Sequence, residues 1–461
     1  MNKFLFFTLL VSALSLTSCL SDSKKADKLR LDNKFEEAAE LYQKAADEGD
    51  AYAKWRLSKA YANGDGVDYD EDKALKLLKE ASKEGCEEAI CDLAYAYMFG
   101  WYNMKVDEKK GKTMLDGLVK RTDNAYVLTR FAKLLFFGSD LYEKDIDRAM
   151  SILSKIKDKN NAEYLLFMGV IFVNGTDEID VDGNKVVDYC TKAFNKGRRY
   201  SAYLLAGIYQ NGFEGIKKDK NKYIEWLNQG IKANVTECMT ETAQLCFSED
   251  SIYQDIHNPH RGIELLIKAS KHGSGEAYTN LGYIYYEGKY VNKNDKKAFE
   301  YYQKATKLKN ASGAFHLGLA YIDGKGCDKD VKKGIETWEL ASDYGSGAAA
   351  NNLFCYYSDG MYTEDKNVID KKLAKKYLLR SAELRDDVGC YNLARRYYWG
   401  NDLFEKDDSQ AFVYMKIAAD QGYVDACEWL SYFYKNGIGC DKNPQKAKEY
   451  KDKTIAKEER K

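Results

Sequence analysis

The sequence has only two prolines, no Ser/Gly-rich linker and no composition break across its 461 residues. A chain of this length usually forms several domains, and domain boundaries fall in flexible, polar linkers. The lack of such linkers predicts one continuous array rather than separate domains. Long hydrophobic runs are also missing. Beyond the N-terminal segment, nothing approaches the ~20 apolar residues that a membrane-spanning helix needs.

Net charge is nearly absent as well. The chain carries 71 Lys and Arg residues against 72 Asp and Glu residues. Nucleic-acid binding depends on positive charge concentrated on one surface. The balance therefore argues against nucleic acid as the main partner.

Residues and motifs typical of catalysis are scarce. The sequence has no HExxH helix, no Gly-x-Ser-x-Gly elbow and no lysine placed for a phosphate loop. Acidic loops at 68–72 and 178–183 are expected to be turns or helix caps, because the second lacks the glutamate of a calcium loop. We expect no catalytic residue, cofactor, metal or small-molecule substrate. The few histidines match no zinc spacing: His257, His260, His272 and His316.

Cysteine is present, but its positions do not indicate a disulfide framework. Cys327 and Cys440 occupy the place that holds Val67 and Val291 in other copies of a repeat, and cysteine packs there as a small hydrophobe. Cys238 and Cys246 are a separate case, because they are eight residues apart. On one continuous helix they would lie ~12 Å apart, too far for a disulfide. A bond between them stays open at this point.

One sequence motif recurs about every 36 to 38 residues. It consists of a leucine, a tyrosine four residues later, a glycine turn, an Asp or Asn, and a lysine followed by a small residue. A fixed period of this length is the sequence signature of a solenoid. The clearest copies are Leu57, Tyr61, Gly64, Gly66, Asp70, Lys73 and Ala74; Leu281, Tyr285, Gly288, Asn294, Lys297 and Ala298; Leu317, Tyr321, Gly324, Gly326, Asp330, Lys333 and Gly334; and Leu430, Tyr434, Gly437, Gly439, Asn443, Lys446 and Ala447.

Each repeat contains two segments whose apolar residues recur at helical spacing. Leu57, Ala60 and Tyr61 recur at three- and four-residue steps, which predicts one buried helix face. The glycine turn ends this first helix, and an Asp or Asn caps a second one. Pro259 and Pro444 each follow a capping asparagine, at the one helical position where proline costs nothing. Two helices of about 12 to 14 residues should therefore form an antiparallel pair in each unit.

This pattern resembles the Sel-one-like repeat, a longer relative of the tetratricopeptide repeat. The resemblance covers residues 32–453, with about eleven units and an opening half-unit at 35–49. Units near Trp101, Phe137, Gly175 and Ile252 are degenerate. The family implies an all-α, right-handed solenoid that binds other proteins, with the first helices of the units lining a concave face. Many bacterial members of the family are exported.

The N-terminus has the features of an export sequence. Lys3 precedes an apolar stretch at 4–16, which is too short to span a membrane. It ends in Leu16-Thr17-Ser18-Cys19, which resembles the bacterial lipobox and implies lipid attachment at Cys19. The alternative is an ordinary secretory leader with an incidental cysteine. In proteobacterial lipoproteins, which this segment resembles, a residue other than Asp after the cysteine implies transport to the outer membrane, and Leu20 stands at that position. The expected segments are a signal peptide (1–18), a tether (19–31), the array (32–453) and a charged tail (454–461).

These observations predict a lipid-anchored scaffold of the cell envelope that binds segments of partner proteins. The alternatives are an accessory subunit of one envelope enzyme complex and, with the least support, an enzyme. Partner-binding residues are expected on first helices, away from the apolar stripe, where Asn and Arg can pair with backbone or carboxylate groups. The candidates are Lys54, Asn280, Asn351, Asn352, Asn392, Arg395 and Arg396.

Overall fold

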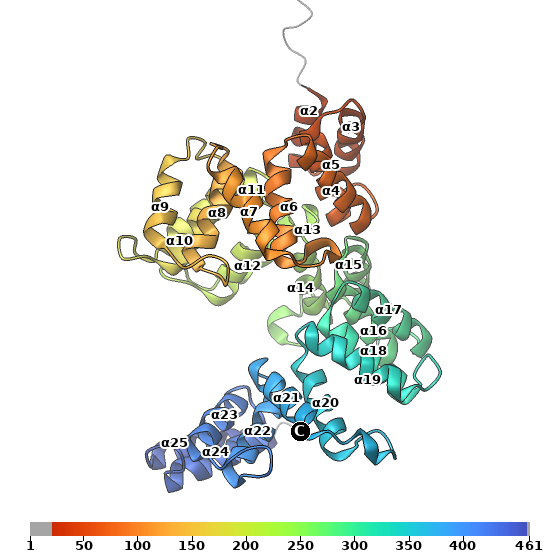
Figure 1. Cartoon of the computed structure of the whole chain (residues 1–461), viewed down its shortest axis with the longest axis vertical. Coiled ribbons are helices and arrows are strands. Elements are labelled where there is room, and N and C mark those ends of the chain that lie inside the picture. The colour runs from red at the N-terminus through yellow and green to blue at the C-terminus, as the bar shows by residue number, and fades with distance from the viewer. Residues whose placement is uncertain (1–20, 459–461) are drawn as a thin grey trace, which may run out of the picture. The chain divides into compact units, whose positions relative to one another are not determined.

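The computed structural model describes residues 21–458, which form α-helices joined by short turns (Figure 1). The helices come in consecutive pairs, as the repeat pattern predicts. The first helices of the pairs are α2 (Asp22–Leu31), α4 (Ala51–Asn63), α6 (Glu87–Phe99), α8 (Ala125–Phe137), α10 (Ala162–Asn174), α12 (Ser201–Asn211), α14 (Thr236–Phe247), α16 (Gly275–Glu287), α18 (Ala311–Asp323), α20 (Gly347–Asp359), α22 (Asp387–Trp399) and α24 (Val424–Asn436).

Each first helix packs against the second helix that follows it. Short 3-10 helices interrupt three of the loops, at Trp101–Asn103, Ser251–Tyr253 and Lys366–Val368. The second helices are α3 (Phe35–Asp47), α5 (Glu71–Lys83), α7 (Glu108–Val119), α9 (Ile146–Lys155), α11 (Gly183–Asn195), α13 (Lys220–Lys232), α15 (Pro259–Lys271), α17 (Asp295–Lys307), α19 (Val331–Asp343), α21 (Lys371–Glu383), α23 (Asp408–Asp420) and α25 (Pro444–Glu458).

The array divides into two compact units, which end and begin at Gly273 and Ser274. Within each unit, first helices contact the first helices of neighbouring repeats, as in α4–α6, α6–α8, α16–α18 and α20–α22. Second helices do not contact one another to a comparable extent. First helices are therefore the more closely spaced layer of each stack, which is the layer expected on the inner side of a curved solenoid.

The repeat positions pack as the periodicity predicts. Leu57 and Leu78 lie in the core, together with alanines that let the helices approach closely. Asp70 caps α5 by accepting the amide hydrogen of Lys73. Gly64 ends α4 with a φ of 64°, a left-handed conformation that favours glycine. The prediction of an all-α solenoid of helix pairs is confirmed.

The second glycine of the turn has an additional packing role. A Cβ atom on Gly66 would collide with the backbone carbonyl of Phe35, the first residue of the second helix in the preceding repeat. Gly326 meets Asp295, and Gly439 meets Asp408, in the same way. The turn of one repeat thus packs directly on the start of the preceding second helix, and no side chain fits between them.

Two of the expected boundaries need correction. Residues 22–31, expected to be a tether, form α2, which packs on α3 and buries Ser23 and Ala26. The small buried side chains leave no apolar stripe in this segment, so its helix was not recognised. The opening half-unit is therefore a complete pair, which precedes the eleven pairs from α4 to α25 and gives twelve pairs in the described residues. At the other end, α25 runs past the expected boundary to Glu458, with Thr454 buried.

Cys238 and Cys246 both lie on α14, and both are buried free thiols. No helix between residues 21 and 458 has both the length and the apolar character needed to cross a bilayer. The proposed signal peptide and Cys19 lie outside the described residues.

Candidate functional site

Five of the seven candidate residues lie on two neighbouring first helices, α20 and α22. The helices are oriented by Leu353 and Leu393, which are fully buried in the core of the second unit. Asn352 and Asn392 directly precede these leucines and are half-buried. Helix periodicity places them beside the apolar stripe rather than within it. The structure thus brings together Asn351, Asn352, Asn392, Arg395 and Arg396.

The asparagines differ in their availability to a partner. The Nδ2 of Asn392 donates to the Oδ1 of Asn351 at 2.9 Å, which links α22 to α20. Asn351 is only 8% exposed. It therefore bridges two repeats and leaves little surface for a partner, and its role in partner binding stays a prediction. Asn392 and Asn352 keep part of their surface accessible.

Both arginines lie over aromatic rings. The guanidinium carbon of Arg395 is 5.0 Å from the ring centroid of Trp399, and that of Arg396 is 5.5 Å from the centroid of Phe354. Rings at these distances attract a guanidinium group through their quadrupole. A cleft of about 200 Å³ opens beside them, lined by Asn392, Arg395, Arg396, Trp399, Gly400 and Asn401.

An aromatic cluster continues from this cleft onto α24, and sequence reasoning missed it. The ring centroid of Trp399 is 5.1 Å from that of Trp429, which is 6.0 Å from that of Tyr432. Trp399 is 52% exposed and Tyr432 is 47% exposed. We call this area the α22–α24 surface; it comprises Asn392, Arg395, Arg396, Trp399, Trp429 and Tyr432.

The other two candidates lie elsewhere. Lys54 on α4 makes an ion pair with Glu84, the residue that follows α5, and its side chain is 15% exposed. It is therefore largely engaged within its own repeat. Asn280 lies on α16, half-buried, at the same repeat position as Asn352 and Asn392.

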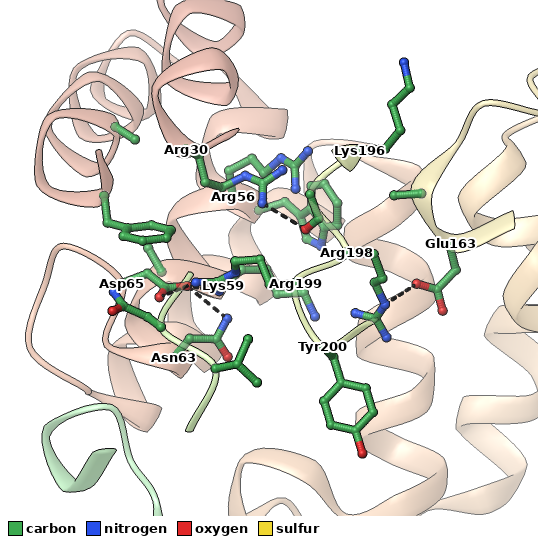
Figure 2. Close-up of a pocket in the computed structure, with 18 of the residues that line it drawn as sticks. Arg30, Arg56, Lys59, Asn63, Asp65, Glu163, Lys196, Arg198, Arg199 and Tyr200 are labelled. Atoms are coloured by element: carbon green, nitrogen blue, oxygen red, sulfur yellow. Dashed lines mark hydrogen bonds and ion pairs between the residues drawn. The ribbon is translucent and has the colours of Figure 1, made fainter. Parts of the chain in front are cut away.

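The first unit contains a second, more enclosed site that the sequence did not indicate. A cavity of about 440 Å³ is lined by α2 to α4, by the ends of α6, α8 and α10, and by the turns before α12 and α14. Contacts between distant repeats surround it. The Nη1 of Arg199 donates to Oδ1 of Asp65 at 2.8 Å (Figure 2). The Nδ1 of His272 lies 3.1 Å from the carbonyl oxygen of Asn63. Repeats far apart in sequence thus meet within this unit.

Asp92 organises one wall of this cavity from a fully buried position. It accepts hydrogen bonds from Trp55 Nε1 at 2.8 Å and Tyr126 Oη at 2.7 Å. Lys59 lies 3.0 Å and Arg130 3.7 Å from its oxygens. Burial alone would raise the pKa of Asp92, but the two cations and the hydrogen bonds outweigh burial and lower it to about 2.

The remaining residues considered from sequence form no reactive centre. Within residues 21–458, no group of three or more His, Cys, Asp or Glu side chains is placed to hold a metal ion. The Nδ1 of His257 contacts the carbonyl oxygen of Ser248. His316 stacks on Tyr302, with 5.1 Å between the ring centroids.

Comparison with known proteins gives partial matches to two curated regulators. The chain is 34% identical over 92 residues to "Chitin synthase regulator SKT5" of Saccharomyces cerevisiae, which covers 20% of this chain and 13% of that protein. It is 38% identical over 60 residues to an "Exopolysaccharide production negative regulator" of Rhizobium leguminosarum bv. viciae, covering 13% of this chain and 22% of the relative. The matches span far less than two thirds of either relative.

A solved structure matches most of the chain. The protective antigen c5321 of uropathogenic Escherichia coli, described as displaying an SLR fold, is 20% identical, with a TM-score of 0.42. The match covers 92% of this chain and 91% of that one.

The family comparison is more extensive. The model described as "Sel1 repeat" matches ten segments: 31–50, 51–86, 87–115, 199–235, 237–274, 275–310, 311–345, 347–386, 388–423 and 424–450. The stretch at 116–198 falls between matches, although α8 to α11 have the same helix-pair arrangement there. The matches cover well over half of the sequence and agree with the resemblance found in its repeats. The chain belongs to the Sel1 repeat family.

Proposed function

We propose that this protein is an interaction scaffold that holds a segment of a partner protein against the α22–α24 surface. Proteins of the Sel1 repeat family are protein-interaction scaffolds or regulators. The observation that carries the proposal is the exposure of Trp399 and Tyr432 beside Arg395, on adjacent first helices. Clusters of exposed apolar side chains on a folded protein are typical of interaction surfaces.

The chemistry of this surface suits a protein segment. Trp, Tyr and Arg are the residue types most enriched where truncation costs the most binding energy. The indole of Trp399 offers a flat apolar face, while Arg395 and Arg396 supply donors for backbone carbonyls or carboxylates. Asn392 can extend this set with one further amide group. An extended segment with an apolar side chain and an acidic neighbour would match this arrangement.

Attachment to the cell envelope through Cys19 is the second part of the proposal. Its support is the sequence Leu16-Thr17-Ser18-Cys19 after an apolar stretch. Because α2 begins at Asp22, only two residues separate Cys19 from the first helix of the array. A lipid at Cys19 would therefore hold the first unit close to a membrane.

Site-specific crosslinking tests where a partner binds. A photoreactive amino acid at position 395 on α22 should give crosslinked protein adducts in membranes. The same amino acid at Leu340, an exposed apolar position on α19, serves as the control because α19 is a second helix. Adducts at position 340 but not at 395 would contradict the proposal. One stoichiometric adduct would indicate an accessory subunit, and several minor adducts would indicate a scaffold with several clients.

A further inference from the structure

The cavity of the first unit has an unusual concentration of positive charge. Its lining includes four carboxylates, Asp65, Glu88, Glu163 and Glu237. Against these stand seven cationic side chains, Arg30, Arg56, Lys59, Arg130, Lys196, Arg198 and Arg199. The chain as a whole is almost neutral. This excess is therefore local and built by the fold.

Most of these cations are paired with carboxylates of the protein. Arg198 lies 3.2 Å from Glu163, and Arg199 contacts Asp65. Lys59 and Arg130 share Asp92, so two cations have one carboxylate between them. These ion pairs fix the cavity walls, and the site of Lys59, Arg130 and Asp92 keeps one net positive charge.

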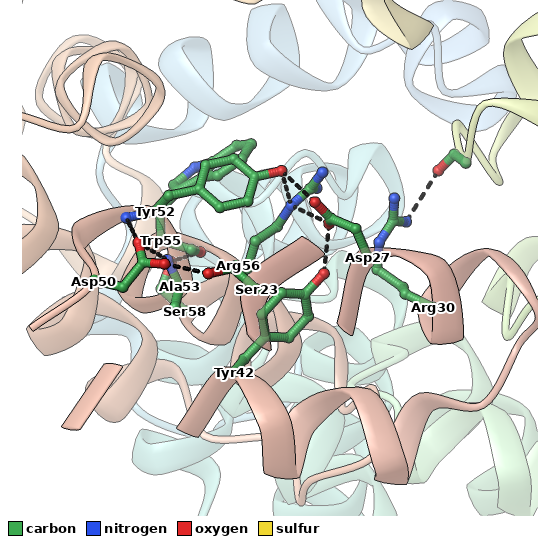
Figure 3. Close-up of polar contacts among 11 residues, drawn as sticks. Ser23, Asp27, Arg30, Tyr42, Asp50, Tyr52, Ala53, Trp55, Arg56 and Ser58 are labelled. Carbon is green, nitrogen blue, oxygen red and sulfur yellow. Dashed lines mark hydrogen bonds and ion pairs between the residues drawn. The ribbon is translucent and has the colours of Figure 1, made fainter. Parts of the chain in front are cut away.

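Arg30 is the exception among the half-buried arginines of the lining, because it makes no ion pair with a carboxylate of the described residues. Its Nη1 donates to the backbone carbonyl oxygen of Gly197 at 3.3 Å, and its Nε is buried without a partner among the described residues. Asp27, whose carboxylate acts electrostatically on Arg30, is already occupied by other partners. It accepts from Tyr42 Oη at 2.6 Å and from Tyr52 Oη at 2.9 Å, and it lies 3.0 Å from Arg56 (Figure 3).

The electrostatic surroundings of Arg30 agree with its lack of an ion pair. Burial lowers the pKa of the Arg30 guanidinium, and the positive charge of Arg56 lowers it further. The labelled side chains of Arg30 and Arg56 lie on the same side of the cavity (Figure 2). An anion placed between these groups would relieve both the repulsion and the unused donor capacity of Arg30.

We infer that this cavity binds a carboxylate group of a peptide, with Arg30 as its principal ligand. A guanidinium presents a planar fork of donors that fits a carboxylate. A single guanidinium without an ion pair favours a monoanion over a phosphate dianion, which the four lining carboxylates would repel more strongly. The cavity volume lies in the range of about 300–1,000 Å³ that is typical of ligand pockets. The site is separate from the α22–α24 surface and does not rest on it.

The carboxylate can come from a chain terminus or from an acidic side chain, and three pools of N-acetylated random hexapeptides distinguish these sources. One pool lacks Asp and Glu but has free C-termini, a second is the same pool with amidated C-termini, and a third is amidated but includes Asp and Glu. The full-length protein is immobilised, and retained peptides are quantified by mass spectrometry. We expect retention of the first or third pool at least tenfold above the second.

Single substitutions then test whether the retained peptides bind in this cavity. Arg30→Gln should reduce retention at least tenfold, whereas Arg121→Gln, which changes an exposed arginine of the same unit, should leave it unchanged. Glu237→Gln removes a negative charge from the lining and should increase retention, a gain that a folding defect cannot produce. Melting temperatures check that each variant is folded.

Equal retention of all three pools, or of none, would overturn the inference. It would also be overturned if folded Arg30→Gln retained peptides as well as the wild type does. Stabilisation of the wild type by inorganic phosphate, without retention of any peptide pool, would assign the cavity to a phosphate instead.

Discussion

Trp55 Nε1 donates a hydrogen bond to Asp92 Oδ2 at 2.8 Å, between residues that are 37 positions apart. Both residues lie on first helices, α4 and α6, so this bond links one repeat to the next. Asp92 also accepts from Tyr126 on α8. One buried carboxylate thus connects three consecutive repeats, and its partners Trp55 and Tyr126 line the cavity that contains Arg30.

Loss of this carboxylate should strongly destabilise the first unit. Asp92→Ala leaves Lys59 and Arg130 without their buried partner, which typically costs about 3–5 kcal/mol. Asp123→Ala is the control, because Asp123 pairs with Lys157 at the surface, where such pairs contribute about 0–1 kcal/mol. Urea unfolding followed by circular dichroism measures both variants. Equal losses of stability would contradict the central role of Asp92.

The Asp92 carboxylate should also make the free energy of unfolding depend on pH in the acidic range. Its pKa falls from an ordinary 3.8 to about 2 on folding. Because the folded-state pKa is the lower one, the stabilisation is present above about pH 4 and is lost as the pH falls through about 2. The shift corresponds to about 2 kcal/mol. Wild-type protein should lose this amount over that pH range relative to Asp92→Asn. Parallel pH profiles for the two proteins would rule out the contribution.

Two glycines of the second unit separate the effects of backbone conformation and close packing. Gly326 has a φ of 75°, and a Cβ there would collide with the Asp295 carbonyl. Gly345 has a φ of 103°, but nothing lies within 4 Å of its Cβ position. Gly345→Ala should cost about 1 kcal/mol from backbone strain alone, and Gly326→Ala should cost clearly more. Thermal denaturation compares them, and a smaller loss for Gly326→Ala would disprove the packing role.

Lipid attachment at Cys19 remains a prediction from the sequence. Cells supplied with a clickable fatty acid should label the wild-type protein, and Cys19→Ala should stay unlabelled. Cys86→Ala changes a buried cysteine and should keep the label. A label of equal strength on the Cys19→Ala variant would exclude this site.

The helix pairs could be predicted because their determinants are local. Asn258 caps α15 at Pro259, and Gly64, Gly288 and Gly324 end their first helices in a left-handed conformation. By contrast, the sequence pattern did not predict α2, because the side chains that this helix buries are small. Local patterns identify a helix through its apolar stripe, and this helix has none.

The two candidate sites depend on information that the repeat pattern does not contain. The contact between Arg199 and Asp65 joins residues 134 positions apart, so the cavity around Arg30 exists only once the first unit has folded. Trp399 could not be separated from the many aromatic residues of the core, because its exposure is set by the neighbouring helices. The repeat pattern correctly places Asn392 and Arg396 on a first helix near Leu393, and their role in partner binding stays a prediction.

The most direct measurement of the central claim compares partner recovery for three forms of the full-length protein. These are the wild type, Trp399→Ala/Tyr432→Ala, and the control Leu340→Ala on a second helix. Proteins crosslinked to each form in membranes are purified and quantified by mass spectrometry, with circular dichroism and melting temperature confirming equal folding. We predict that the double variant loses its partners by about tenfold or more, whereas Leu340→Ala keeps them. Undiminished recovery with the folded double variant, or an equal loss with Leu340→Ala, would contradict partner binding at the α22–α24 surface.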